Sequence, residues 1–221
     1  MISTGNDIVS LKSEGTARSA QKRFYSKIIT ESELLLYSSK KFAILPFENF
    51  VWLLWSIKEA TYKYQKRNNP DLLFSPKKII IQHIEFPLNH IAVKFGNAEF
   101  EQGLIDDEGC YTCKIQTDTD VFYSKSKVYD ELIHTIVNNT DDFANVRCGV
   151  KYIQHTDYEI QSKSVRHFAL NTLSTIFPND SLQIVKNSIG CPIVVKNDKP
   201  LQLPLSFAHH ENFVGYSLLV E

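Results

Sequence analysis

The chain has 221 residues, of which 43% are hydrophobic, and its formal net charge is −1. This length allows one large domain or two small ones, with enough apolar residues for a substantial core. A charge so close to zero does not indicate nucleic-acid binding, and no stretch is apolar enough for a membrane span or a secretion signal. We therefore expect a soluble cytoplasmic protein.

Three short patterns organise the first 45 residues. Residues 5–9 (GNDIV) predict a short strand with a carboxylate, Asp7, in its middle. A basic stretch follows at residues 18–27. Thr30 and Glu33 then have the capping-box spacing, in which each side chain bonds the backbone N–H of the other, and they predict a short helix through Leu36.

Residues 47–66 predict a long helix that follows Pro46 and ends before Pro70. At 100° per residue, one arc of this helix is apolar and consists of Phe50, Leu53, Ile57, Ala60 and Tyr64. The opposite arc is mainly aromatic and also carries two charges; it consists of Trp52, Trp55, Glu59, Tyr62 and Lys63. A carboxylate among aromatic side chains needs a partner. Two partners for Glu59 stay open, namely Lys63 one turn later and a bound metal ion or phosphate.

The rest of the chain is mostly strand-like. Strands are predicted at 78–86 and 91–95, followed by a hairpin whose arms, 99–105 and 110–116, flank the turn 106–109. Helices are predicted at 128–137 and 161–177, and strands at 182–185, 193–196, 203–207 and 213–219. Successive blocks of helix and strand indicate an α+β protein in two halves, with the division between residues 96 and 142.

Four cysteines are too few for a disulfide framework in a chain of this size. Cys110 and Cys113 form a C-x-x-C pair, but they lack the second pair or the histidines that a zinc site needs. They also lie in an alternating stretch that predicts a strand, not at the helix start typical of redox pairs. We interpret both as small residues of a strand.

Three separated segments of the chain carry short motifs. Residues 5–9 resemble G-x-D-I-V, residues 55–63 (WSIKEATYK) resemble W-x-x-K-E-A-x-x-K, and residues 205–210 (LSFAHH) resemble an S-x-S-H strand. Together these segments resemble the 4′-phosphopantetheinyl transferase superfamily. Between them lie Arg23-Phe24, the Thr30/Glu33 pair and Gly190-x-Pro192 in the matching order. This order is that of the small holo-acyl-carrier-protein synthases, but those enzymes are about half as long. Residues 87–186 carry no motif.

The resemblance implies transfer of phosphopantetheine from coenzyme A to a serine of an acyl or peptidyl carrier protein, as in fatty acid biosynthesis. Asp7 and Glu59 would bind Mg²⁺, an ion usually held by one or two carboxylates plus substrate phosphates. Lys63 would reach a phosphate as a point charge, and the serine proton would pass to Glu59 or to a water on the metal. His209 would contact the pyrophosphate. Arg166 and Lys163 are candidates for the 3′-phosphate, although charged helix residues more often face solvent.

The resemblance also implies the architecture of the larger members. We expect two similar halves, 1–105 and 106–221, each a helix on a small antiparallel sheet, with the active-site cleft between them. A single chain would then be a self-sufficient monomer. Asp7 and His209 would serve one pyrophosphate, so that the two ends of the chain would have to meet.

Three positions depart from the family pattern. Val9 stands where many larger members have a second acidic residue, Ala208 replaces a serine, and no glycine follows the helix motif, where residues 64–67 read YQKR. These departures keep two alternatives open: a carrier-binding scaffold without activity, and a magnesium-dependent phosphohydrolase that uses the same carboxylates.

Overall fold

The computed structural model describes residues 3–13, 18–37, 45–87, 95, 101–103 and 109–220. The helices are α1 Lys22–Tyr25, α2 Glu31–Tyr37, α3 Phe47–Asn68 and α4 Tyr158–Ile176, with a 3₁₀ turn at Pro76–Lys78. The strands are β1 Gly5–Ser10, β2 Ile80–Glu85, β3 Glu101–Gly103, β4 Tyr111–Gln116, β5 Val121–Val128, β6 Leu132–Asn138, β7 Val146–Tyr152, β8 Leu182–Lys186, β9 Pro192–Lys196, β10 Lys199–Leu201, β11 Leu205–His210 and β12 Phe213–Leu219.

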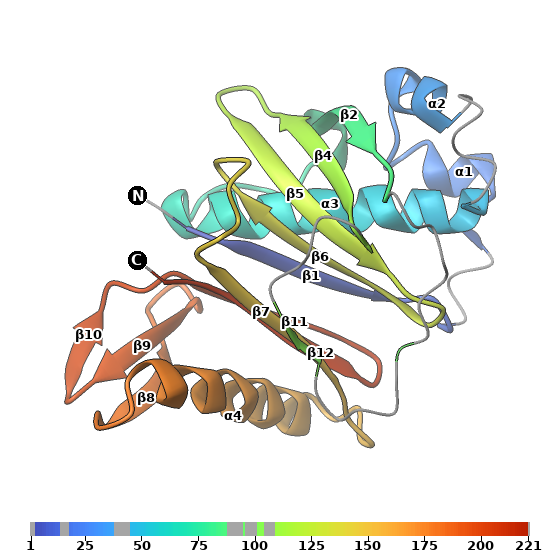
Figure 1. The fold of residues 1–221 in the computed structure, drawn as a ribbon. Coiled ribbons are helices and arrows are strands. Elements are labelled where there is room, and N and C mark those ends of the chain that lie inside the picture. The colour runs from blue at the N-terminus through green and yellow to red at the C-terminus, as the bar shows by residue number, and fades with distance from the viewer. Residues whose placement is uncertain are drawn as a thin grey trace.

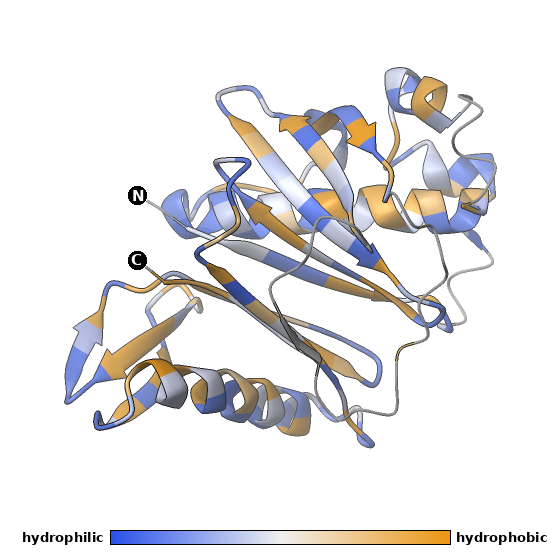
Figure 2. Ribbon diagram, in the orientation of Figure 1, coloured by the Kyte–Doolittle hydropathy of each residue, from blue (hydrophilic) through white to orange (hydrophobic). Residues whose placement is uncertain are grey.

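A five-stranded antiparallel sheet, in the order β1-β6-β5-β4-β2, is covered on one face by α3 (Figure 1). The helix follows Pro46, as predicted, and the predicted apolar face is buried: Phe50, Leu53, Ile57 and Ala60 are fully enclosed. Hydropathy falls along α3 from its largely hydrophobic first half to its hydrophilic C-terminal end (Figure 2). The polar end is the part of the helix that leaves the core.

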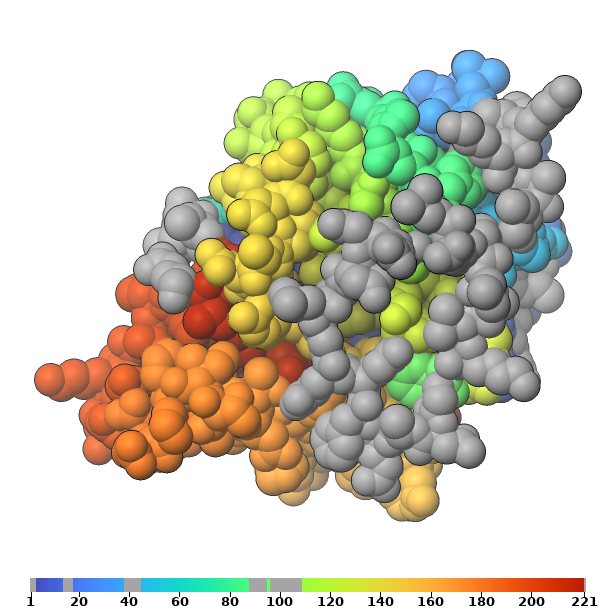
Figure 3. Space-filling model, in the orientation of Figure 1, coloured from blue at the N-terminus to red at the C-terminus, as the bar shows by residue number. Residues whose placement is uncertain are grey.

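A four-stranded antiparallel sheet, in the order β11-β12-β7-β3, packs against α4, and a small sheet, β10-β9-β8, extends beside it (Figure 1). In the space-filling view the C-terminal part of the chain, orange to red, forms the lower left of the molecule (Figure 3). The helix confirms the prediction over 161–177, and Val165, Phe168, Ala169 and Leu173 are buried. Phe168 meets Tyr216 of β12 edge to face, with ring centroids 4.9 Å apart. The protein is therefore α+β with antiparallel sheets. In the part of the chain that the structure describes, no helix has the length and apolar character needed to cross a membrane.

The outer edge of β1 joins the two larger sheets, because it lies against β11 and β12. Thr4 and Ser217 share a hydrogen bond (2.9 Å), and Asn6 Nδ2 donates to the carbonyl of Gly215 (2.9 Å). These contacts bring the first and last strands of the chain side by side (Figure 1). The ends of the sequence therefore meet, as the motif order predicted.

Two sequence predictions were wrong. Residues 128–137 are not a helix: β5 ends at Val128 and β6 begins at Leu132. All seven residues of β6 are buried, so the strand lacks the alternation that separates strands from helices. The predicted hairpin is also absent, because β3 pairs with β7 in the four-stranded sheet whereas β4 pairs with β2 and β5. The predicted strand at 91–95 lies outside the described residues except for Phe95, which is not in a strand.

The strand pairing also bears on the halves predicted at 1–105 and 106–221. Strands β4, β5 and β6 follow that boundary, yet all of them pair in the sheet of β1. Strand β3 lies in the second sheet although it precedes β4, and after β6 the chain passes to the second sheet again between residues 138 and 146. A division into two similar halves stays a prediction.

Gly5 allows β1 to pass close to α3. A Cβ at this position would overlap the carbonyl oxygen of Ala60. We expect Gly5→Ala to lower the free energy of unfolding by about 1–3 kcal/mol, as overpacking does in cores. Chemical denaturation measures the effect. Because the clash is with backbone, adding Ala60→Gly should not restore stability; a full rescue would contradict this account.

His134 lies in β6, the strand that pairs with β1, and its side chain is buried. Its Nε2 lies 2.8 Å from Asn6 Oδ1. Burial, helped by Lys127, lowers the pKa of His134 from 6.5 to about 4. Between pH 6.5 and 4, His134 is protonated in the unfolded chain but stays neutral in the folded protein. We therefore expect stability to fall as the pH drops from 6.5 toward 4, by at most about 1.4 kcal/mol per pH unit. His134→Gln, which keeps a donor for Asn6 but does not titrate, should flatten this profile in denaturation measurements; an unchanged slope would argue against it.

Candidate active site

Asp7 and Lys63 meet where β1 crosses α3. The close approach at Gly5 and Ala60 sets the two elements against each other, and Lys63 Nζ donates to Asp7 Oδ1 at 2.8 Å. Asp7 is only 6% exposed, and its second oxygen, Oδ2, is buried without a hydrogen-bond partner among the described residues. A bound cation would give this oxygen the partner that it lacks.

Glu59 lies one turn before Lys63 on the same helix and lines the same pocket as Asp7. Its pKa is raised, first by burial and then by the charge of Asp7, whereas Lys63 lowers it. Lys63 thus forms its ion pair with Asp7 and compensates Glu59 only in part. Two carboxylates that share one lysine and line the same pocket suit a small cation, which would neutralise the remaining negative charge.

The chemistry of these donors fits magnesium better than a transition metal. In the described part of the chain, no group of three or more His, Cys, Asp or Glu side chains is arranged to hold a metal. A site with two carboxylates is incomplete for zinc, but it suits Mg²⁺, which keeps several waters and binds substrate phosphates. Asp7 and Glu59 are the residues that would hold the ion.

His209 of β11 completes this first pocket, which has a volume of about 320 Å³. Asp7, Glu59, Lys63 and His209 all line it, together with Trp55, Ile8, Phe207, Ala208 and His210. The pocket walls desolvate the imidazole and lower the pKa of His209, and Lys63 lowers it further. The ring of Tyr158 packs edge-on against His209, with centroids 5.7 Å apart. The structure thus brings the residues of all three sequence motifs to one place.

A second pocket of about 240 Å³ adjoins the first and shares Lys63, Phe207 and His209 with it. Its other charged lining residues are all basic: Lys66, Arg67, Arg166 and Lys186. Among the residues that the structure describes, no aspartate or glutamate lines it. Because such a pocket is uniformly basic, it favours an anionic ligand with several charges. We call it the basic pocket, and the first one the carboxylate pocket.

The two predicted phosphate-binding residues of α4 have different positions. Arg166 lines the basic pocket and donates to Ser162 Oγ at 2.8 Å, which steadies the guanidinium. Lys163 is exposed and lines neither of these two pockets.

Sequence reasoning missed several residues of the basic pocket. Arg67 Nη1 donates to the carbonyl of Leu205 at 2.7 Å, which ties the last turn of α3 to the start of β11. Lys186 donates to the Tyr158 hydroxyl at 3.0 Å, on the pocket rim. The departure from the family pattern after Lys63 was the available signal, because the helix continues to Asn68 and so carries Arg67 into the pocket.

Two other features of the sequence have structural roles. Ala208 is buried in an apolar cluster with Ile8 and Phe213, so an alanine packs well where the family pattern has a serine. Cys113 lies in β4, as predicted, where burial raises its pKa. Of the four cysteines, Cys191 is the one that is not buried.

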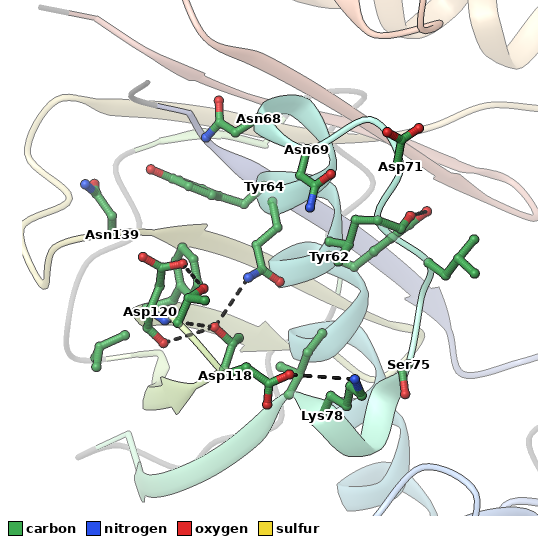
Figure 4. A pocket seen from close by; sticks show the side chains of 18 residues that line it. Tyr62, Tyr64, Asn68, Asn69, Asp71, Ser75, Lys78, Asp118, Asp120 and Asn139 are labelled. Atoms are coloured by element: carbon green, nitrogen blue, oxygen red, sulfur yellow. Dashed lines mark hydrogen bonds and ion pairs between the residues drawn. The ribbon is translucent and has the colours of Figure 1, made fainter.

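A larger cavity, about 940 Å³, lies elsewhere, between the C-terminal end of α3 and the turn that joins β4 to β5 (Figure 4). None of the predicted site residues lines it. Its polar side chains bond one another: Gln65 donates to Thr117 Oγ1 at 3.3 Å, and Lys78 lies 3.7 Å from Asp118. Size alone therefore does not identify the functional pocket here.

A family model described as the 4′-phosphopantetheinyl transferase superfamily matches residues 3–119, just over half of the chain. The match includes Asp7, Glu59 and Lys63 and ends before α4 and the His209 strand. No curated protein and no solved structure matches the chain.

Proposed function

Because the chain belongs to the 4′-phosphopantetheinyl transferase superfamily, we propose that it transfers phosphopantetheine from coenzyme A to a serine of an apo-acyl or peptidyl carrier protein. Adenosine 3′,5′-bisphosphate is the second product. One observation carries this proposal: a pocket with two carboxylates adjoins a pocket whose charged lining residues, in the described part of the chain, are basic apart from histidine. That pairing suits a substrate with a nucleotide at one end and a reacting phosphate at the other.

The basic pocket takes the nucleotide end of coenzyme A. Its 3′-phosphate and pyrophosphate carry several negative charges, and Arg166, Arg67 and Lys186 offer fixed or tethered cations. Lys63 and His209 line both pockets, so the pyrophosphate spans their junction. The phosphoryl group to be transferred then lies on the side of the carboxylate pocket.

In the carboxylate pocket the serine oxygen attacks the β-phosphorus, and the bond from that phosphorus to the bridging oxygen breaks. Magnesium held by Asp7 and Glu59 would neutralise charge on the pyrophosphate. Lys63, held in place by Asp7, adds a positive charge beside it. The serine proton leaves for Glu59, whose raised pKa suits a base, or for water in the pocket.

We also propose that the protein acts as a monomer. One chain supplies Asp7 from its first strand and His209 from its eleventh, so both ends of the sequence contribute to one site. The proposed two halves are the two larger sheets with their helices. Light scattering of the purified protein tests this; a stable dimer would contradict it.

Mass measurement of carrier proteins tests the activity. The chain is incubated with coenzyme A, Mg²⁺ and a panel of apo-carriers from fatty-acid, polyketide and peptide synthesis, and each carrier is weighed. A mass gain of one phosphopantetheine group is the expected result. No gain on any carrier would favour an inactive scaffold, and cleavage of coenzyme A without a carrier would favour a phosphohydrolase.

Cys191 provides a test of nucleotide binding that does not depend on activity. It lies in the basic pocket, and the other three cysteines are buried, so a thiol reagent should label Cys191 first in the folded protein. We expect adenosine 3′,5′-bisphosphate to slow this labelling about 10-fold at ten times its dissociation constant, because only the unbound fraction reacts. Labelling at an unchanged rate, measured by mass spectrometry, would contradict the nucleotide position.

A further inference from the structure

His210 follows the motif histidine and is the last residue of β11. Its side chain is half-buried and lines the carboxylate pocket with Asp7, Glu59 and Lys63. Unlike His209, it does not line the basic pocket. His210 therefore stands on the side of the site where the proposed reaction occurs, away from the nucleotide.

A backbone contact determines the role that this imidazole can play. The N–H of Ser10, at the end of β1, donates to His210 Nδ1 at 3.2 Å. A backbone N–H can only donate, so Nδ1 must present its lone pair, and the ring proton of neutral His210 lies on Nε2. With Nδ1 engaged and Nε2 protonated, His210 has no free lone pair. It can donate a hydrogen bond, but it cannot serve as a general base.

A further fixed donor would serve the chemistry of this pocket. Lys63 gives one of its three ammonium protons to Asp7, and Asp7 and Glu59 can only accept or bind a cation when ionised. In phosphoryl transfer, charge spreads over the non-bridging oxygens of the transferred group, and fixed donors aimed at them lower the barrier. We propose that His210 Nε2–H donates to a non-bridging oxygen of the β-phosphoryl group, which makes His210 a catalytic residue.

This inference rests on the proposed transferase function. It assigns a part in the chemical step to the residue that follows the motif histidine, and it gives the two adjacent histidines different roles. His209 faces the junction of the pockets, where the pyrophosphate lies, and His210 faces the group that moves. The proton on Nε2 is shared and is not transferred, so the reaction's proton balance is unchanged.

Two substitutions test the roles of His210 Nδ1 and Nε2 separately. His210→Asn places an amide oxygen near the position of Nδ1, keeps an acceptor for Ser10, and lacks any group at Nε2. His210→Gln reaches the Nε2 position with an amide N–H but leaves Ser10 without its acceptor. We expect His210→Asn to lower kcat about 100-fold, with an unchanged melting temperature and an unchanged KM for coenzyme A. His210→Gln should keep kcat within about 10-fold of the native value and melt at a lower temperature.

His167→Asn, at an exposed histidine on α4, is the matched control and should change nothing. Native kcat in His210→Asn would overturn the proposal, and so would equal losses in both variants that follow their melting temperatures. Labelling of Cys191 should be slowed equally by adenosine 3′,5′-bisphosphate in all three variants. If the native protein modifies no carrier, the proposed function and this inference both fail; if it does and His210→Asn is fully active, only the inference fails.

Discussion

Asp7→Asn is expected to reduce phosphopantetheine transfer about 100-fold or more, because it removes one of the two carboxylates that would hold the cation. The fold should survive. Asp7 Oδ2 is already buried without a partner among the described residues, and a neutral side chain removes the repulsion that raises the pKa of Glu59. Carrier mass gain measures the transfer, and thermal unfolding with and without Mg²⁺ plus coenzyme A measures ligand binding.

Asp118→Asn is the matched control for this result. Asp118 is an exposed aspartate that lines the large cavity of Figure 4 and not the carboxylate pocket. Its transfer rate should equal that of the native protein. Full activity in Asp7→Asn, or the same loss in Asp118→Asn, would show that the reaction does not use the carboxylate pocket.

Glu33→Ala should lower the free energy of unfolding by about 3–5 kcal/mol, the cost of leaving a buried charge without its partner. Lys58 and Glu33 form an ion pair at 2.8 Å with both side chains fully buried. Lys58 also donates to the carbonyl of Ile28, and Glu33 Oε1 accepts from the backbone of Ile81 on β2. Burial lowers the pKa of Lys58, which Glu33 opposes. The pair therefore connects α2, α3 and the sheet immediately beside Glu59.

Urea denaturation of four proteins tests the pair: the native chain, Glu33→Ala, Lys58→Met and the double variant. We expect strong coupling, so that the double variant is much more stable than the sum of the single losses predicts. Glu31→Ala, at an exposed position in the first turn of the same helix, should change stability by less than about 0.5 kcal/mol. Additive losses would mean that the two residues act independently.

Local patterns were sufficient to predict the elements that bury one face and leave the other more exposed. The apolar face of α3, from Phe50 to Tyr64, and that of α4 both predict the observed helices because one side of each packs on a sheet. The capping box was equally local: Thr30 N donates to Glu33 Oε2 at 2.8 Å, and Glu33 N donates to Thr30 Oγ1 at 3.3 Å. Where the surroundings are uniform, the pattern disappears, as in the wholly buried β6.

Pairing between distant strands could not be predicted in the same way. Strands β3 and β4 are close in sequence, and a polar turn between them favours a hairpin. In the structure they belong to different sheets, because β3 completes the edge beside β7. Such choices depend on which edges remain open after the whole chain has folded, and no short stretch of sequence carries that information.

By itself, the sequence determined which residues are the candidates for the chemistry: Asp7, Glu59, Lys63 and His209 stand in motifs that the family resemblance singles out. Only the tertiary structure decided how they combine. Lys63 bonds Asp7 across two elements, and Glu33 holds the buried Lys58. The imidazole of His210 has its proton on Nε2 because Ser10, two hundred residues earlier, donates to Nδ1. Residue type limits what a side chain can do, but burial and partners, which arise from contacts between distant segments, determine which of those roles it takes.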